Sequence, residues 1–272
     1  MKAWACIALS ICALAAVGHT QTAPTQQSIE AKLHGPFLML RGMWEGGKLT
    51  FDSQGNLIGT AEKTLFSLSA VMVTQIQLSD TQLEIRGRRA GLDFSGNNFS
   101  NSLKIAAKPY SKTDVDIVVS RDAQHPEALE PALDRVFSVG IDEMLAKEAP
   151  SYWQPLLRQS LHLRTEDKAG PPNPGAGVYH PGGGTRNPIL RYAPDDLLQR
   201  EVKLLGVTGV SVIGLIVDAI GMPQRVSVVR PLGMGADEYA VAEVLQYRFE
   251  PAMYQGHAVP VQINIEVNFR RY

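Results

Sequence analysis

Cysteine is almost absent from this sequence. The 272 residues contain only Cys6 and Cys12, which both lie near the start of the chain. No cysteine remains beyond them to form a disulfide, to bind a metal as a thiolate or to act as a nucleophile. The rest of the chain must therefore be stabilised by packing alone.

An excess of charge of either sign is absent as well. The sequence has 26 Lys+Arg against 27 Asp+Glu, which gives a formal net charge of −1 at pH 7. Proteins that bind a phosphate backbone present clustered basic residues that displace its counterions. The balanced charge therefore predicts no nucleic acid partner.

Long apolar runs are limited to residues 3–17. The run follows Met1 and the positively charged Lys2, and the small residues Ala16 and Gly18 precede a polar stretch that starts at His19. This order is typical of a signal peptide, residues 1–18, that is cleaved on export. The run is also shorter than the roughly 20 residues that cross a bilayer. We expect a periplasmic protein; the alternative is an inner-membrane protein anchored through an uncleaved N-terminal segment.

The usual signatures of a catalytic or metal site are missing too. A Gly-x-Ser-x-Gly motif does not occur, and the histidines show no paired ligand spacing. The adjacent carboxylates Asp142-Glu143 and Asp237-Glu238 are predicted to lie on helices, pointing to different faces as solvated surface. We predict no catalytic residue, no metal site and no cofactor; a hydrolytic enzyme is the least favoured alternative, because distant residues can converge on one site. The histidines are His19, His34, His125, His162, His180 and His257.

The first half of the chain alternates short apolar runs with Gly, Asn and Asp, a pattern that predicts strands. A helical stretch is expected at residues 125–145, where apolar residues recur every three or four positions, and a second short helix at 152–161. We therefore predict a β-rich domain at residues 33–163 that ends in helices. The expected strands are residues 37–40, 48–51, 65–73, 82–86, 103–106 and 115–119.

Proline and glycine are concentrated in one short segment. The 23 residues of 166–188 include five Pro and six Gly. Such a composition buries too little apolar surface to order itself and is typical of a linker. Residues 164–188 are therefore predicted to be a Gly/Pro linker, followed by a second domain at residues 189–272.

The second domain is predicted to be strand, strand, helix, strand. Residues 210–217 are apolar on both faces, as in a central strand, and a turn leads to a partner strand at 224–230. A helix is expected from residue 236, with an apolar stripe up to Leu245 and with Pro251 enforcing its end. Residues 259–269 alternate strictly between apolar and polar. A short strand at 189–192 and a helical turn at 195–205 are expected ahead of these. The fold class of the chain is therefore α+β.

The order and punctuation of these segments resemble the C-terminal domain of the TonB energy transducers over residues 198–269. At the entrance, Leu198-Gln199 stand where that family often has an aromatic residue followed by Pro or Ser. Transducers also carry an inner-membrane anchor and a long Pro-rich span, whereas this sequence has a predicted signal peptide and a short linker, so the resemblance does not imply energy coupling. The blocks that carry it are Gly209-Val210-Ser211-Val212, Val217-Asp218-Ala219-Ile220-Gly221, Val226-Ser227-Val228-Val229, Tyr247-Arg248-Phe249-Glu250-Pro251-Ala252 and Gly256-His257-Ala258-Val259-Pro260-Val261.

The resemblance also implies a partner and a site. In TonB-like domains the last strand lies at a sheet edge and receives an extended segment of an outer-membrane transporter as an added strand. It implies protein binding, connected with transport, to an outer-membrane transporter or another envelope protein. The alternatives are an envelope structural or ligand-binding protein without energy coupling, and a homodimer formed through edge strands. The implied peptide-binding residues are Val259, Val261, Gln262, Ile263, Asn264, Ile265 and Glu266.

Overall fold

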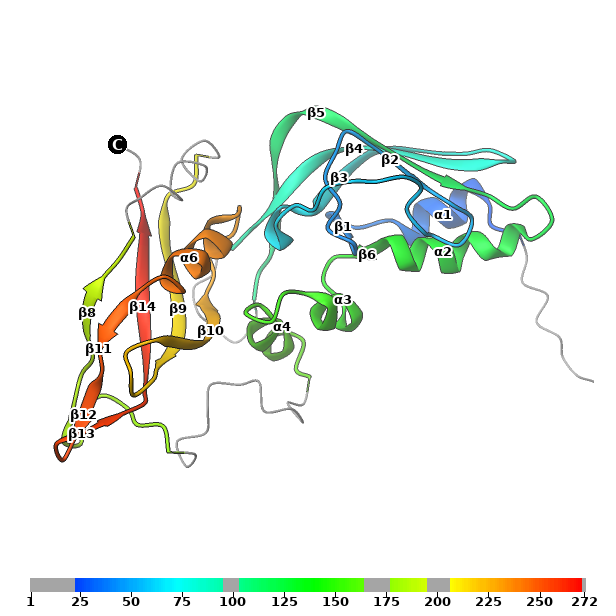
Figure 1. Cartoon of the computed structure of the whole chain (residues 1–272). Helices are drawn as coiled ribbons and strands as arrows, with labels where there is room; N and C mark the ends of the chain where they lie inside the picture. Colours follow the sequence, from blue (N-terminus) through cyan, green and yellow to red (C-terminus); the bar gives the residue numbers. More distant parts are fainter. Residues whose placement is uncertain (1–22, 95–102, 164–176, 195–205, 271–272) are drawn as a thin grey trace, which may run out of the picture.

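The computed structural model describes residues 23–94, 103–163, 177–194 and 206–270 (Figure 1). Helices and strands are both present in each half of the chain, which confirms the predicted α+β class. The predicted signal peptide and the helical turn at 195–205 lie outside the described residues, as do residues 164–176 of the predicted linker. Within the described ranges, no helix is long and apolar enough to span a membrane.

A six-stranded sheet forms the N-terminal half, in the order β2-β5-β4-β3-β1-β6. β2 pairs with β5 in parallel, and all other neighbours are antiparallel. β4 and β5 are longer than predicted, because their pairing runs from Gln82↔Ser120 to Asp93↔Ala106. The bounds are β1 Leu38–Leu40, β2 Lys48–Phe51, β3 Ala70–Leu78, β4 Gln82–Asp93, β5 Ala106–Ser120 and β6 Phe137–Val139, with a 3-10 turn η1 at Phe66–Leu68.

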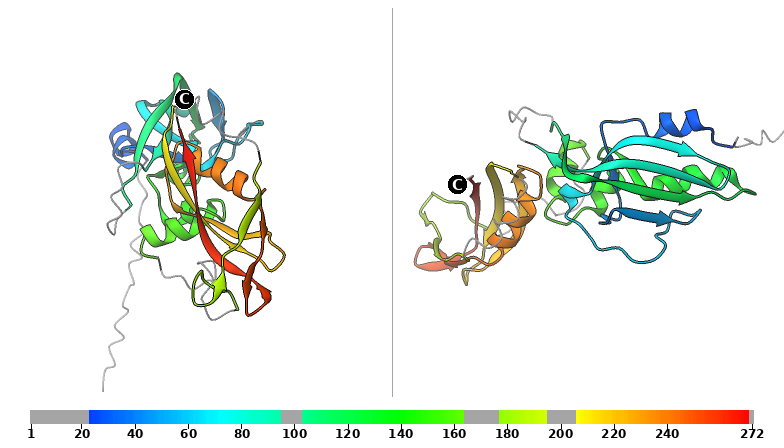
Figure 2. Two further views of the ribbon diagram at one scale, coloured as in Figure 1. Left: turned by 90° about the vertical axis from the view of Figure 1, so that its left-hand side faces the viewer. Right: turned by 90° about the horizontal axis from the view of Figure 1, so that it is seen from above.

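Helices α1 (Gln26–Lys32) and α2 (Leu129–Val136) lie along this sheet (Figures 1 and 2). Ile29 of α1 and Leu133 of α2 share one buried core with the strand residues Leu83 and Ile117. Full burial of such side chains stabilises the fold by about 2 kcal/mol each. The alternate residues of the strands point away from this core and form a polar face.

The helical stretch predicted at residues 125–145 is interrupted, so that part of the prediction is wrong. A 3-10 turn η2 (Pro126–Ala128) and α2 are followed by strand β6, which pairs with β1, and α3 (Glu143–Glu148) starts only after it. Phe137 is extended because pairing with Leu40 at the sheet edge supplies backbone hydrogen bonds that a helix would otherwise provide. The second predicted helix is present as α4 (Gln154–Ser160).

Three antiparallel strands form the sheet of the C-terminal domain, in the order β10-β9-β14. β9 (Gly209–Val217) is the central strand, as predicted, and β10 (Pro223–Arg230) and β14 (Val261–Phe269) flank it. Helix α6 (Ala236–Val244) packs against β9 and β10. The predicted order of strand, strand, helix and strand is confirmed.

Helix α6 ends at Val244, several residues before the end that Pro251 was predicted to enforce. Leu245, which was predicted to lie in the apolar stripe of this helix, is 50% exposed. Arg248–Glu250 form strand β11, which pairs with β8 (Ile189–Tyr192). The N–H of Phe249 also donates to the carbonyl of Gly221, at 2.9 Å. Pro251, which has no N–H to donate, instead separates β11 from β12 (Ala252–Tyr254).

Residues 177–188 of the predicted linker lie against the C-terminal domain. Thr185–Arg186 form the short strand β7, which pairs with β12 and, through it, with β13 (His257–Val259). The preceding Gly182 and Gly184 have φ of 99° and 90°, which glycine adopts without strain. The glycine run therefore turns the chain into β7, whereas its composition alone indicated a flexible joint.

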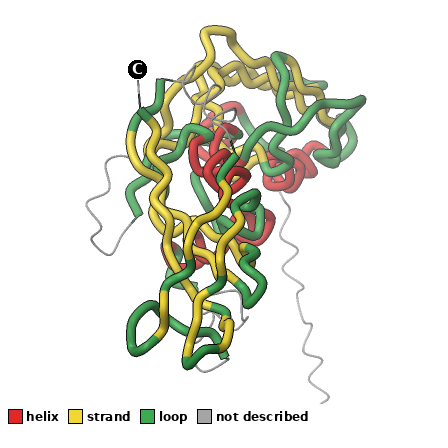
Figure 3. Tube along the Cα trace, turned by 60° about the vertical axis from the view of Figure 1, so that its left-hand side comes forward, coloured by secondary structure: helices red, strands yellow, loops and turns green. Residues whose placement is uncertain are grey.

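The two halves of the chain share an apolar core where they meet, with helices grouped between the two sets of strands (Figure 3). Trp153 is fully buried there, with its ring centroid 5.6 Å from those of both Phe66 and Phe94. Main-chain hydrogen bonds cross the contact, among them those from Met234 to Leu92 at 2.8 Å and from Phe94 to Leu232 at 3.2 Å. We call this contact the seam and define it by residues 66–68, 92–94, 152–153 and 232–238.

Candidate functional site

Strand β14 forms one edge of the C-terminal sheet. It pairs with β9 over nine residues, from Val261↔Val217 to Phe269↔Gly209, without a register shift. Among the described strands, none runs along its other side. Its outer row of main-chain groups is therefore available over most of its length.

The contacts of Tyr179 show which main-chain groups face outward. The N–H of Gln262 donates to the carbonyl of Tyr179 at 2.9 Å, and the N–H of Tyr179 donates to the carbonyl of Pro260 at 2.8 Å. Gln262 therefore turns its N–H and C=O away from β9. Because antiparallel pairing alternates and the register is unbroken, the same holds for Asn264, Glu266 and Asn268. These three residues form the open edge.

The side chains of β14 alternate as predicted. Val261, Val267 and Phe269 are buried, and Asn264, Glu266 and Asn268 are exposed. Ile263 and Ile265 are half-buried, so one face of the strand presents an apolar strip beside the edge. An added strand would meet this strip with every second residue.

The structure separates Val259 from the other residues named for the site. Val259 lies on β13, paired with Ala252 of β12, and Pro260 stands between it and β14. Gln262 is on β14, but its outward N–H is already bound to Tyr179. Of the residues expected from the sequence, Asn264 and Glu266 carry open main-chain groups, while Ile263 and Ile265 contribute side chains.

An open hollow of about 480 Å³ adjoins the start of this edge. Residues of the segment after Tyr179 form one wall, and β14 forms the other. This hollow was not predicted, because one of its walls comes from the segment that was expected to be a linker. Its lining residues are His180, Pro181, Asn187, Pro188, Gln262, Ile263 and Asn264.

The opposite edge of the sheet is closed at the seam. The outward N–H of Val228, on β10, donates to the carbonyl of Tyr152 at 2.9 Å. Helix α4 also packs on β10. The geometry therefore leaves β14, and not β10, able to receive a strand.

The adjacent acids Asp237 and Glu238 are not the solvated surface that the sequence indicated. Asp237 is 0% exposed and Glu238 is 5% exposed. Burial raises the pKa of Asp237, although hydrogen bonds from Ser211, Leu232 and Gly233 oppose this effect. Burial and the neighbouring charge of Asp237 raise the pKa of Glu238 to about 7. The prediction was wrong because the partners of Glu238 lie more than 80 positions away along the chain.

The other acidic pair is only partly solvated. The side chain of Asp142 is 42% exposed, caps the N-terminus of α3 by accepting from the N–H of Leu145, and forms an ion pair with Arg41. These contacts hold the pKa of Asp142 below its usual range despite the desolvation that opposes them. Asp142 is therefore a structural residue that joins β1 to α3.

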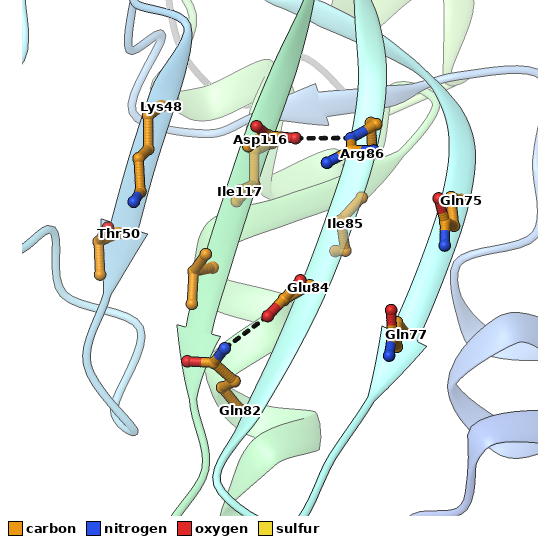
Figure 4. Close-up of a pocket in the computed structure, with 11 residues that line it drawn as sticks. Lys48, Thr50, Gln75, Gln77, Gln82, Glu84, Ile85, Arg86, Asp116 and Ile117 are labelled. Atoms are coloured by element: carbon orange, nitrogen blue, oxygen red, sulfur yellow. Dashed lines mark hydrogen bonds and ion pairs between the residues drawn. The ribbon is translucent and has the colours of Figure 1, made fainter.

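A second hollow, of about 390 Å³, lies on the polar face of the N-terminal sheet (Figure 4). Arg86 pairs with Asp116 at 2.9 Å, and Gln82 donates to Glu84 at 2.5 Å. Two cations and two anions balance its charge. Among the described residues, no group of three or more His, Cys, Asp or Glu could hold a metal ion. The lining residues are Lys48, Thr50, Gln75, Gln77, Gln82, Glu84, Ile85, Arg86, Asp116, Ile117 and Val118.

The C-terminal half is a small α+β domain with one open sheet edge, attached through the seam to the β-rich N-terminal half. Residues 200–270 match the family described as Gram-negative bacterial TonB protein C-terminal, which confirms the resemblance expected from the sequence. The N-terminal half matches no family. Neither the curated proteins nor the solved structures gave a match to the chain. Domains of this family act in the cell envelope and interact with envelope proteins such as outer-membrane transporters.

Proposed function

We propose that this protein is a periplasmic TonB-like protein that binds an extended segment of an outer-membrane transporter, or of another envelope protein, by strand addition to β14. The open edge at Asn264, Glu266 and Asn268 carries this proposal. Unpaired edge groups bind an extended chain through main-chain hydrogen bonds, which require no particular sequence in the partner. The family match at residues 200–270 gives independent support.

The bridge to Tyr179 indicates how a partner would be aligned. Tyr179 pairs with β14 in parallel at its first residue, Val261, and the chain then turns away around the hollow. A bound segment would continue along the same edge from Asn264 toward Phe269. The half-buried Ile263 and Ile265 favour a segment that places apolar residues at every second position.

Titration of the full-length protein with extended peptides derived from outer-membrane transporters tests this function. Saturable binding is expected, with slowed hydrogen exchange at the amides of Asn264, Glu266 and Asn268, because these N–H groups become bonded. Absence of binding at millimolar peptide would contradict strand addition at this edge.

The periplasmic location is a separate part of the proposal. Fractionation of a Gram-negative host should recover the protein in the periplasm, with a mature N-terminus at His19. An intact chain that starts at Met1 in the inner-membrane fraction would contradict the cleavage. That result would support the anchored alternative and, with it, energy coupling.

The polar hollow of the N-terminal sheet favours a second candidate function, ligand binding without energy coupling. Its balanced charges and three glutamine amides suit a neutral ligand rich in hydroxyl groups, since each amide can both donate and accept. Chitotetraose should bind the full-length protein and lose affinity in Gln77→Ala. Asp80→Ala, an exposed residue outside the lining, is the control. If chitotetraose does not bind at about 10 mM, its binding free energy is weaker than about 3 kcal/mol. That result would exclude this ligand class.

A further inference from the structure

Glu238 connects helix α6 to the N-terminal half at the seam. Its Oε1 accepts hydrogen bonds from the main-chain N–H of Ser67 at 2.8 Å and from Nε1 of Trp153 at 3.2 Å. Neither donor can accept a proton in return. Both partners belong to the N-terminal half, so this one side chain ties the two halves together.

The second carboxyl oxygen has a different kind of partner. Oε2 of Glu238 lies 2.8 Å from Oγ of Ser67, which in turn accepts from the N–H of Gly235 at 2.9 Å. A hydroxyl group can either donate or accept. A proton on Oε2 can therefore be donated to Oγ of Ser67 without movement of a heavy atom, while the hydroxyl hydrogen of Ser67 turns away from Oε2.

Burial and the adjacent carboxyl group of Asp237 disfavour the negative charge of Glu238, and the hydrogen bonds from Ser67 oppose this effect. Asp237 precedes it on α6; its Oδ1 accepts from the N–H of Leu232 at 2.9 Å and its Oδ2 from the N–H of Gly233 at 2.6 Å, and these bonds favour its ionised form against the opposing effect of burial. Oδ1 of Asp237 also accepts from the hydroxyl of Ser211, at 2.6 Å. From the turn before α4, Tyr152 faces the same place, and the charge of Glu238 raises the pKa of its phenol further above the value set by burial. Two adjacent buried charges repel each other strongly in a low-dielectric interior.

We infer that Glu238 is a proton-controlled latch between the N-terminal half and α6, closed when Glu238 is protonated and loosened when it is ionised. Because burial and Asp237 hold the pKa of Glu238 near 7 in the closed form, the closed form binds a proton that the open form releases. The stabilisation is therefore complete at pH below the ordinary value of 4.5 and is lost as the pH rises through about 7.

Opening of the seam would change the binding surface of the C-terminal domain. The N–H of Val228 would lose the carbonyl of Tyr152, and the outer edge of β10 would become free. The domain would then present two open edges in place of one. The latch thus controls how many strands the C-terminal sheet can add.

Hydrogen exchange of the full-length protein, corrected for the intrinsic pH dependence of amide exchange, tests the latch. In the wild type, protection of the amides of Ser67 and Val228 should fall about 30-fold between pH 5.5 and pH 8, if the pKa of Glu238 returns to its ordinary value on opening. Protection at the far end of the β4–β5 pairing, from Gln82↔Ser120 to Ile85↔Ile117, should stay constant. In Glu238→Gln the fall should disappear, because the Gln carbonyl accepts from Ser67 and Trp153 and its amide donates to Oγ of Ser67.

Equal pH dependence in the wild type and in Glu238→Gln would overturn the latch. If Glu238→Gln does not fold, the test rests on the wild type alone. Protection of the amides of Ser67 and Val228 that does not change between pH 5.5 and pH 8 would also contradict the latch. A fall that includes the amides of residues 82–85 equally would indicate global unfolding and would also contradict a local latch.

Discussion

The Asn264→Pro variant is expected to lose about tenfold or more of its affinity for an extended peptide while it keeps its fold. Proline removes the outward N–H at the first open position of β14, and its ring occupies the place of the partner's carbonyl. The lost main-chain hydrogen bond and the clash together weaken the binding free energy by more than about 1.4 kcal/mol, which is tenfold in affinity. The pairing with β9 survives, because the N–H of Asn264 does not point toward β9. Calorimetric titration of the full-length variant gives the affinity.

Asn264→Ala is the matched control for this experiment. It removes the same exposed side chain but retains the N–H, so its affinity should stay within about twofold of the wild type. Thermal unfolding of both variants should confirm that the sheet is intact. If Asn264→Pro binds as well as Asn264→Ala, the partner does not pair with the main chain of β14, and the proposed mode of binding is wrong.

Trp153→Ala is expected to destabilise the whole chain by about 4 kcal/mol, because it opens a cavity in a core that both halves share. The indole is fully buried against Phe66 and Phe94, and its Nε1 donates to Glu238. The substitution therefore also removes one of the hydrogen bonds that bind the buried carboxyl group. Urea unfolding, followed by circular dichroism, measures the change in the free energy of unfolding.

Trp44→Ala serves as the control for the loss of a large ring. Trp44 is only half-buried, and Nζ of Lys63 lies 3.2 Å from its ring centroid. We expect a loss of about 1 kcal/mol from this cation–π contact and the partial burial. If Trp153→Ala costs no more than Trp44→Ala, the seam contributes little, and the two halves unfold independently of each other.

The strands of the C-terminal sheet were predictable because the patterns that identify them involve residues close together in the sequence. Strict alternation at residues 261–269 places the buried and exposed side chains of β14 correctly, since the period of a strand is two whatever it pairs with. The glycine at position 221 and the two-sided apolar run of β9 likewise identify a hairpin with a central strand. The order of strands and helix follows from such short-range patterns, whereas the edge position of the last strand was implied by the resemblance to the TonB C-terminal domain.

The seam was not predictable because its partners are distant in sequence. From the sequence, Glu238 is expected to be an exposed residue in the first turn of a helix. It is buried because Ser67 and Trp153, from the other half of the chain, pack against it and donate hydrogen bonds to it. The early end of α6 has the same origin, since β11 forms by pairing with β8, more than 50 residues earlier. The composition of residues 177–188 predicted a flexible linker. These residues are instead ordered by the pairing of β7 with β12, and not by a core of their own.

Tyr179 already occupies the start of the edge that is proposed to bind a partner. Its two main-chain hydrogen bonds, to Pro260 and Gln262, are intramolecular and carry no cost of bringing two molecules together. A partner segment that pairs only from Asn264 onward leaves them untouched, whereas a segment that extends to Gln262 has to break them first. Lengthening a partner at that end should therefore bring no gain in affinity, and the length of the recognised segment is set by the protein itself.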